Sequence, residues 1–182
     1  MTGFLLAFIA TLLLGVGARD QMLVAGLAAR HGQRPGLLLV GLASAGVASA
    51  AAVWLAGSFA PLLEPPARRM LAVLALGLAA LEMIVLRPKS APAEPTHSLG
   101  AFAAVLLAQQ VLDAARFVLF AIVVASMLPG AAGLGGALGG MAVVAIGWAI
   151  GPALFDLPLG RVRRWLGLIL LVAAGALFAA MR

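Results

Sequence analysis

Hydrophobic residues along this chain are grouped into six long apolar runs, each close to the length that crosses a bilayer. A transmembrane helix needs about 20 predominantly apolar residues. Backbone groups in lipid must satisfy their own hydrogen bonds, and the runs show little strand-like alternation, so each run predicts a helix. The six predicted helices span residues 3–29, 35–59, 69–86, 99–127, 130–151 and 165–181.

An internal repeat relates the two halves of the chain. Positions 94 residues apart carry identical residues at several places, and the Pro-Gly pairs and the tryptophans are the most specific of them. These are Pro35-Gly36 and Pro129-Gly130, and Trp54 and Trp148. With one residue of slip, a pair of arginines also recurs ahead of the third helix of each half, as Arg68-Arg69 and Arg163-Arg164.

The repeat predicts the domain organisation. We expect a first three-helix repeat at 1–89, a polar, proline-rich linker at 90–95 and a second three-helix repeat at 96–182. Because three is an odd number of helices, the second repeat enters the membrane from the opposite side, which is the inverted plan common in secondary transporters. The predicted fold is therefore an all-α membrane protein with six transmembrane helices in two inverted three-helix repeats.

The composition also favours a bilayer over water as the solvent of this chain. Its 182 residues are 64% hydrophobic and 10% charged, with a mean hydropathy of +1.16, whereas soluble domains carry about 25% charged residues. The net charge of +6 arises mainly from basic residues at the ends of the apolar runs. We interpret these residues as topology signals and expect no nucleic-acid partner.

The sequence offers no catalytic constellation. The chain has no cysteine, which excludes thiol chemistry and disulfides, and its two histidines, His31 and His97, both fall in predicted loops. It also contains no HExxH motif and no nucleophile paired with a base. We therefore expect neither an enzyme nor a resident cofactor.

Basic residues near the ends of the helices predict an orientation in the membrane. Seven of them fall on one side and three on the other. The seven are Arg30, Arg34, Arg87, Lys89, Arg161, Arg163 and Arg164, and the three are Arg68, Arg69 and Arg182. The positive-inside rule places the side with seven charges in the cytoplasm. Both termini are then outside, in a multi-pass protein of the bacterial inner membrane.

Several ionisable and amide side chains interrupt the apolar runs. Because a charge in the bilayer costs about 3 kcal/mol on insertion scales, we expect these residues to have a functional or structural role. The first predicted helix holds Arg19 and Asp20, and the third holds Glu82, which we expect to reach the interface beside Arg87 in a structural role. The fourth predicted helix carries the remaining four: Gln109, Gln110, Asp113 and Arg116.

The spacing in the fourth predicted helix indicates two alternatives. Gln109, Asp113 and Arg116 are spaced i, i+4, i+7 and share a helical face, with Gln110 at its border. A carboxylate with two amides is an oxygen-rich site for a hard cation, so Asp113 and Gln110 are candidate metal ligands. The alternative is a polar clamp between helices, with Asp113 paired to Arg116 or to Arg19.

The residues of the first predicted helix carry a family resemblance. The run Gly15-Val16-Gly17-Ala18-Arg19-Asp20-Gln21 resembles the signature Glu-x-Gly-Asp-Lys/Arg-Thr/Ser, often followed by Gln, of the Gdt-type transporters. Gly17, Arg19 and Gln21 match this signature. Gly15, Ala18 and Asp20 replace its Glu, Asp and Thr/Ser. In the second half, Asp113 matches the family's Asp and Gln110 replaces its Glu.

The resemblance implies a fold and a function. Gdt-type proteins include Golgi and bacterial manganese/calcium transporters thought to exchange a cation for protons, and they are built from two inverted three-helix repeats. It implies a secondary transporter with Asp113 as the central ligand or proton carrier, Gln109 and Gln110 as neutral ligands and Asp20 as the partner from the other repeat. Arg19 and Arg116 would set the charge balance. The expected partners are the lipid bilayer, a transported cation or proton and, in a homo-oligomer, a second copy of the chain.

A second hypothesis comes from a different class. It is that the chain is a degenerate, non-transporting membrane protein with a structural or regulatory role, in which the arginines and aspartates of the first and fourth predicted helices form buried salt bridges. It predicts that neutralising Arg19 and Asp113 together is tolerated better than neutralising either alone, because an unpaired buried charge is the expensive state.

Overall fold

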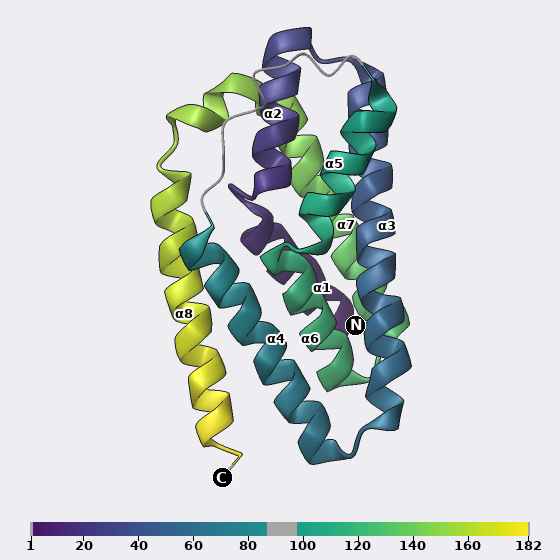
Figure 1. The fold of residues 1–182 in the computed structure, drawn as a ribbon, viewed down its shortest axis with the longest axis vertical. Helices are drawn as coiled ribbons and strands as arrows, with labels where there is room; N and C mark the ends of the chain where they lie inside the picture. The colour runs from purple at the N-terminus through teal and green to yellow at the C-terminus, as the bar shows by residue number, and fades with distance from the viewer. Residues whose placement is uncertain (1, 87–97, 182) are drawn as a thin grey trace.

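The computed structural model describes residues 2–86 and 98–181, and within these ranges the chain is helical, without strands. The predicted linker at 90–95 and the residues Arg87 and His97 lie outside the described residues. The elements are α1 (Thr2–Gly15), α2 (Arg19–His31), α3 (Pro35–Phe59), η1 (Ala60–Leu62), α4 (Pro65–Val85), α5 (Leu99–Val111), α6 (Ala114–Ser126), α7 (Pro129–Ile150), η2 (Gly151–Asp156) and α8 (Leu159–Ala179). Figure 1 shows them packed in one elongated bundle.

Three of these elements are long and apolar enough to cross a membrane. They are Pro35–Leu62, Pro129–Asp156 and Leu159–Ala179, and the number reaches five if each of two bent helix pairs forms one span. The bent pairs are α1 with α2 and α5 with α6. The predictions of an all-helical chain and of membrane-like helices are thus confirmed, and the described residues are compatible with a multi-pass membrane protein.

The first and fourth predicted helices are each broken in the middle, so the prediction of continuous helices is wrong at these two places. The axes of α1 and α2 meet at 59°, and those of α5 and α6 at 53°. At the first break Gly17 has a φ of +69°, a conformation that residues with a Cβ rarely adopt. At the second break Asp113 has the extended backbone of an N-cap, with φ −94° and ψ 148°. The hydropathy pattern runs through both breaks because apolar residues continue on either side.

Helices from the two halves of the chain interleave. α1 packs on α7, while α5 packs on α3, and α3 and α7 also contact each other. α6 contacts α1, α3, α4 and α7, and it lies between α4 and α3 in Figure 1. The second half of each broken helix is therefore enclosed, and both α2 and α6 are buried along most of their length. This packing brings the two breaks into the interior.

The outer surface of the bundle is apolar. Trp54 and Val172 are each 72% exposed, and Leu39 and Leu134 are each 65% exposed. Large hydrophobic side chains are exposed along each of the long helices α3, α4, α7 and α8. A surface of large hydrophobic side chains is compatible with contact to the bilayer.

The contact between α1 and α7 depends on glycine at the point where the two backbones approach. A Cβ at Gly139 would touch Thr11 Oγ1 and lie 2.7 Å from the carbonyl oxygen of Phe8. A Gly139→Leu variant should therefore lose about 1–3 kcal/mol of stability through overpacking, measured as thermal unfolding of the purified protein in mild detergent. Gly77→Leu is the control, because a Cβ at Gly77 meets nothing within 4 Å. Equal losses in the two variants would contradict this account of the contact.

Candidate functional site

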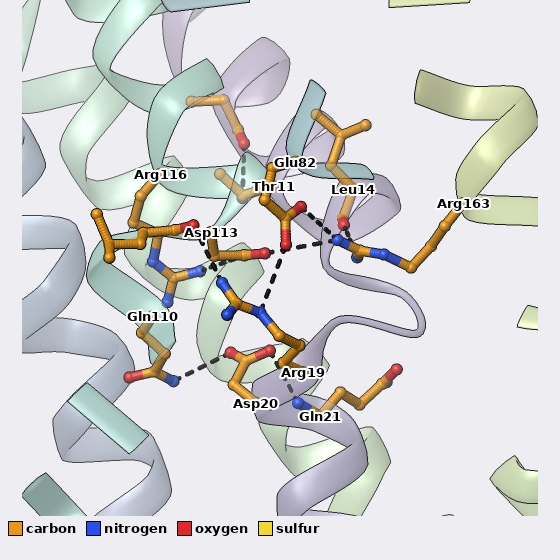
Figure 2. Close-up of polar contacts among 12 residues, drawn as sticks. Thr11, Leu14, Arg19, Asp20, Gln21, Glu82, Gln110, Asp113, Arg116 and Arg163 are labelled. Carbon is orange, nitrogen blue, oxygen red and sulfur yellow. Dashed lines mark hydrogen bonds and ion pairs between the residues drawn. The ribbon is translucent and has the colours of Figure 1, made fainter. Parts of the chain in front are cut away.

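The candidate site lies where the two helix breaks meet. Ala18 is the N-cap of α2 and Asp113 is the N-cap of α6, so the two residues hold the same position in the two broken helices. Figure 2 shows polar side chains from both breaks turned toward one another, joined by side chains from α4 and α8. Residues from five helices, α2, α4, α5, α6 and α8, therefore converge on one buried region.

Two contacts connect one break directly to the other. Gln110 Nε2 donates to Asp20 Oδ2 over 3.2 Å, and Arg19 Nη2 donates to the carbonyl oxygen of Leu112 over 3.3 Å. Asp20 and Gln110 are 2% and 0% exposed, so their hydrogen bond is shielded from water. The structure thus brings the adjacent residues Arg19 and Asp20 to the second break, where their partners Leu112 and Gln110 lie 93 and 90 residues further along the sequence.

Gln21 forms hydrogen bonds with the backbone at the first break. Its Oε1 accepts a hydrogen bond from the amide of Gly17 (2.7 Å), and its Nε2 donates to the carbonyl of Val143 in α7 (3.2 Å). Its own amide donates to Asp20 Oδ1 (2.8 Å). These bonds satisfy N–H groups that a helix start leaves without intrahelical partners. Gln21 therefore has a clear structural role at the site.

Glu82 of α4 and Arg163 of α8 form the shortest ion pair of the site, and both are additions to the predicted set. Arg163 Nη2 lies 2.6 Å from Glu82 Oε2, and Arg19 Nε lies 3.5 Å from Glu82 Oε1. Glu82 and Arg163 are 6% and 2% exposed. Figure 2 shows the Glu82 carboxylate between the two guanidinium groups.

The structure corrects the expected places of Arg163 and Glu82. Arg163 was expected to be a membrane-flanking charge, but α8 begins at Leu159, so Arg163 lies inside the helix on its buried side. Glu82 was expected to reach the interface beside Arg87, which lies outside the described residues, and instead it points into the bundle. An acidic residue in an apolar helix is itself a signal of a buried functional or structural group.

Asp113 is held between two arginines without a close contact to either. Its Oδ2 lies 3.9 Å from Arg116 Nη1, and its Oδ1 lies 3.8 Å from Arg163 Nη2. The polar clamp was predicted to pair Asp113 with Arg116 or with Arg19. Arg116 forms an ion pair with Asp113, whereas Arg19 forms one with Glu82. The prediction that Gln109, Asp113 and Arg116 share one face of a single helix is wrong. The helix is broken between α5, which ends at Val111, and α6, which begins at Ala114.

The charges and helix ends at the site complement one another. Arg163 donates to the carbonyl of Leu14 (3.0 Å) at the end of α1. In the same way, Arg19 donates to the carbonyl of Leu112 (3.3 Å) at the end of α5. Asp20 and Asp113 lie at the beginnings of α2 and α6. Positive groups thus face the negative ends of helix dipoles and carboxylates face the positive ends. This arrangement satisfies the backbone groups that two helix breaks expose in an apolar interior.

The formal charges of the cluster sum to zero. It contains three carboxylates and three guanidinium groups, contributed by Asp20, Glu82 and Asp113 and by Arg19, Arg116 and Arg163. Moving a lone charge from water into an apolar interior costs several kcal/mol, and a partner of opposite charge offsets part of that cost. The balance makes the cluster compatible with burial between helices of membrane-like hydropathy.

The groups available to a cation are oxygen atoms without hydrogen-bond partners. Both carboxylate oxygens of Asp113 and the Oε1 atom of Gln110 are buried without such a partner. The Oε1 atom of Gln109 is buried in the same way, but Gln109 takes part in none of the hydrogen bonds and ion pairs described above for the cluster. Among residues 2–86 and 98–181, however, no group of three His, Cys, Asp or Glu is placed to hold a metal ion. A cation at Asp113 would also compete with Arg116 and Arg163.

A cavity of about 260 Å³ leads toward the cluster between α2, α4 and α8. Its lining includes Met22, Met83, Leu159 and the adjacent arginines Arg163 and Arg164. Because Arg163 also contacts Glu82, its side chain stands between the cavity and the carboxylates. The cavity is a candidate route to the site.

Comparison of the chain with known protein families, with curated proteins and with solved structures finds no match. What is known of its site therefore rests on its own residues and their geometry.

Proposed function

We propose that this chain is a secondary transporter whose substrate site lies where its two broken helices meet. The observation that carries the proposal is the burial of Asp20, Asp113 and Arg116 at the two breaks, where each is no more than 3% exposed. Discontinuous helices whose ends hold substrate and coupling ions near the bilayer midplane are a recurring device of secondary transporters. Ionisable residues inside a membrane are costly and mark the paths of ions and protons.

Two inverted three-helix repeats are part of this proposal. Each half has a broken helix, then a long helix that begins with proline and ends in a 3₁₀ turn, then a helix of 21 residues. Some contacts between the halves also come in matched pairs: α1 packs on α7 as α5 packs on α3, and α2 packs on α7 as α6 packs on α3. Such pairs are expected if a two-fold axis in the membrane plane relates the halves.

The sixth span in this proposal is α4. Its 21 residues extend about 30 Å, which is the thickness of the hydrocarbon core. Arg68, Arg69 and Glu82 make it less apolar than the other spans, but the two arginines lie near its first turn and Glu82 is paired with Arg163. We propose a location in the bacterial inner membrane with both termini outside, an orientation that the excess of basic residues in the loops on the other side supports.

The substrate we propose is a small cation, manganese or calcium first, exchanged for protons, as the resemblance to Gdt-type transporters implies. Asp113 would supply carboxylate oxygens and Gln110 an amide oxygen, the kinds of ligand that such hard cations prefer, and these oxygens have no hydrogen-bond partner in the cation-free protein. In the cation-free protein the arginines act as internal counter-ions, because three buried carboxylates without partners would be expensive. Arriving cations displace a guanidinium group from Asp113, whose ion pairs of 3.8 and 3.9 Å are the longest of the cluster.

Flux measured in proteoliposomes tests this proposal. Vesicles containing the purified chain should move manganese or calcium against an opposing proton flux, followed with a cation dye and a pH dye on the two sides of the membrane. Asp113→Asn should reduce the flux to the background of empty vesicles, because it removes the carboxylate between the two breaks. Glu64→Gln is the matched control, since Glu64 is exposed at the N-cap of α4 and should leave the flux unchanged.

Two results would overturn the cation proposal. One is the absence of manganese and calcium flux in wild-type vesicles under either direction of the pH gradient. The other is a flux through Asp113→Asn that equals the wild-type flux.

A structural, non-transporting role is the second candidate, and the close Glu82–Arg163 pair of 2.6 Å favours it. In this case the cluster serves to close two helix breaks in an apolar interior and holds no substrate. It predicts no flux for any cation, together with a stability that depends on matched charges.

A further inference from the structure

A second feature of the molecule lies outside the charge cluster. A groove of about 750 Å³ runs along α1, α4, α6 and α8 at the end of the bundle where α1 and α4 begin and α6 and α8 end. Its floor is formed by small residues such as Ala72 and Ala121, which are 8% and 3% exposed. Its walls carry larger apolar side chains, among them Leu5, Ile9 and Leu177, each at least 50% exposed.

The polar lining of the groove is confined to one end. Of its lining residues only Thr2, Arg69 and Ser126 carry polar side chains. Thr2 is the first residue of α1, Arg69 lies in the second turn of α4 and Ser126 is the last residue of α6. The groove is therefore apolar along its length and polar at its mouth.

The dimensions of the groove fit one leaflet of a bilayer. From Thr2 to Ile9 the groove follows α1 for about 10 Å, using the rise of an α-helix. Half of a hydrocarbon core is about 15 Å thick. With Arg69 at the level of the headgroups, the apolar part of the groove lies at the depth of the acyl chains.

The charge at the mouth selects the kind of lipid. Arg69 is exposed, none of the ion pairs among the described residues involves it, and Arg68 precedes it. Guanidinium groups bind phosphate through paired N–H donors and favour anionic over zwitterionic headgroups. We propose that this groove is a binding site for an anionic phospholipid, with one acyl chain along α1 and α6 and the headgroup phosphate at Arg69.

Native mass spectrometry of the purified chain in mild detergent tests the proposal. Incubation with phosphatidylglycerol should leave one tightly retained lipid, and phosphatidylcholine with the same acyl chains should be retained less. Arg69→Gln should lower phosphatidylglycerol retention about fivefold, the scale of one basic residue's attraction to an anionic surface. Arg161→Gln, at the exposed start of α8 away from the groove, is the charge-matched control and should retain the lipid.

A second variant separates the groove from general lipid contact. Ala125→Trp fills the groove from an exposed position and should remove the retained lipid of either headgroup, whereas Ala51→Trp on the exposed face of α3 should not. The proposal is overturned if the two phospholipids are retained equally by the wild type, or if Arg69→Gln and Arg161→Gln have the same effect. It is also overturned if Ala125→Trp dissociates a dimer of the chain, because a second copy would then fill the groove.

Discussion

An Arg163→Met variant is expected to lose about 3–5 kcal/mol of unfolding free energy, because removal of one partner leaves a buried charge without compensation. Arg163 Nη2 lies 2.6 Å from Glu82 Oε2, and the remaining partner, Arg19 Nε, is 3.5 Å from the other carboxylate oxygen. The carbonyl of Leu14 also loses its donor. Methionine keeps much of the length of the side chain, so the loss reports mainly on charge. Unfolding of the purified protein in mild detergent measures it.

The double variant Glu82→Gln/Arg163→Met separates the ion pair from the packing of the two side chains. It should be more stable than Arg163→Met alone, because Glu82→Gln removes the buried charge that Arg163→Met leaves with Arg19 as its remaining partner. Arg164→Met controls for the removal of an arginine from α8, since Arg164 is exposed and its loss should change stability little. If the single and double variants are equally unstable, Glu82 and Arg163 are not energetically coupled.

The double variant also distinguishes the two candidate functions. If the cluster only closes the helix breaks, neither the wild type nor the folded double variant moves cations. If the cluster is a transport site, the folded double variant loses cation flux while it keeps its stability. Stability and flux measured on the same preparation therefore give different answers for the two roles.

Much of the fold was predictable because hydropathy and length decide where a chain is helical in a bilayer. The predicted segments at 35–59 and 130–151 differ by at most one residue from α3 and α7 at either end. The two breaks were not predictable in this way, since a change of direction inside an apolar run leaves the hydropathy unchanged. The only local signal was at the first break, where Gly15 and Gly17 flank the bend.

The composition of the cluster was partly predictable from the cost of polar groups in an apolar run. Arg19, Asp20, Gln110 and Asp113 stood out for this reason, and the structure brings them together, whereas their role in transport stays a prediction. The buried position of Arg163 was not predictable from the sequence, because three basic residues within four positions are typical of a membrane-flanking segment. Only the start of α8 at Leu159 shows that one of them faces inward.

Gly17→Ala is expected to lose about 2–5 kcal/mol, the second large effect predicted for this chain. The left-handed backbone at Gly17 (φ +69°) costs an L-residue about 1–2 kcal/mol. A Cβ there would also lie 2.8 Å from Leu159 Cβ, and such overpacking adds about 1–3 kcal/mol. Unfolding in mild detergent, under the conditions used for Arg163→Met, measures the sum.

Gly32→Ala separates the two contributions, because Gly32 has a similar φ of +79° but a Cβ there meets nothing within 4 Å. It should lose only a backbone contribution of about 1–3 kcal/mol, because φ 79° with ψ 169° is a conformation essentially confined to glycine. Equal losses at Gly17 and Gly32 would show that the approach of α8 to the first break is not tight. A larger loss at Gly17 should be accompanied by reduced cation flux, since Arg19 and Asp20 follow the bend directly and a shift of α2 moves both away from Glu82 and Gln110.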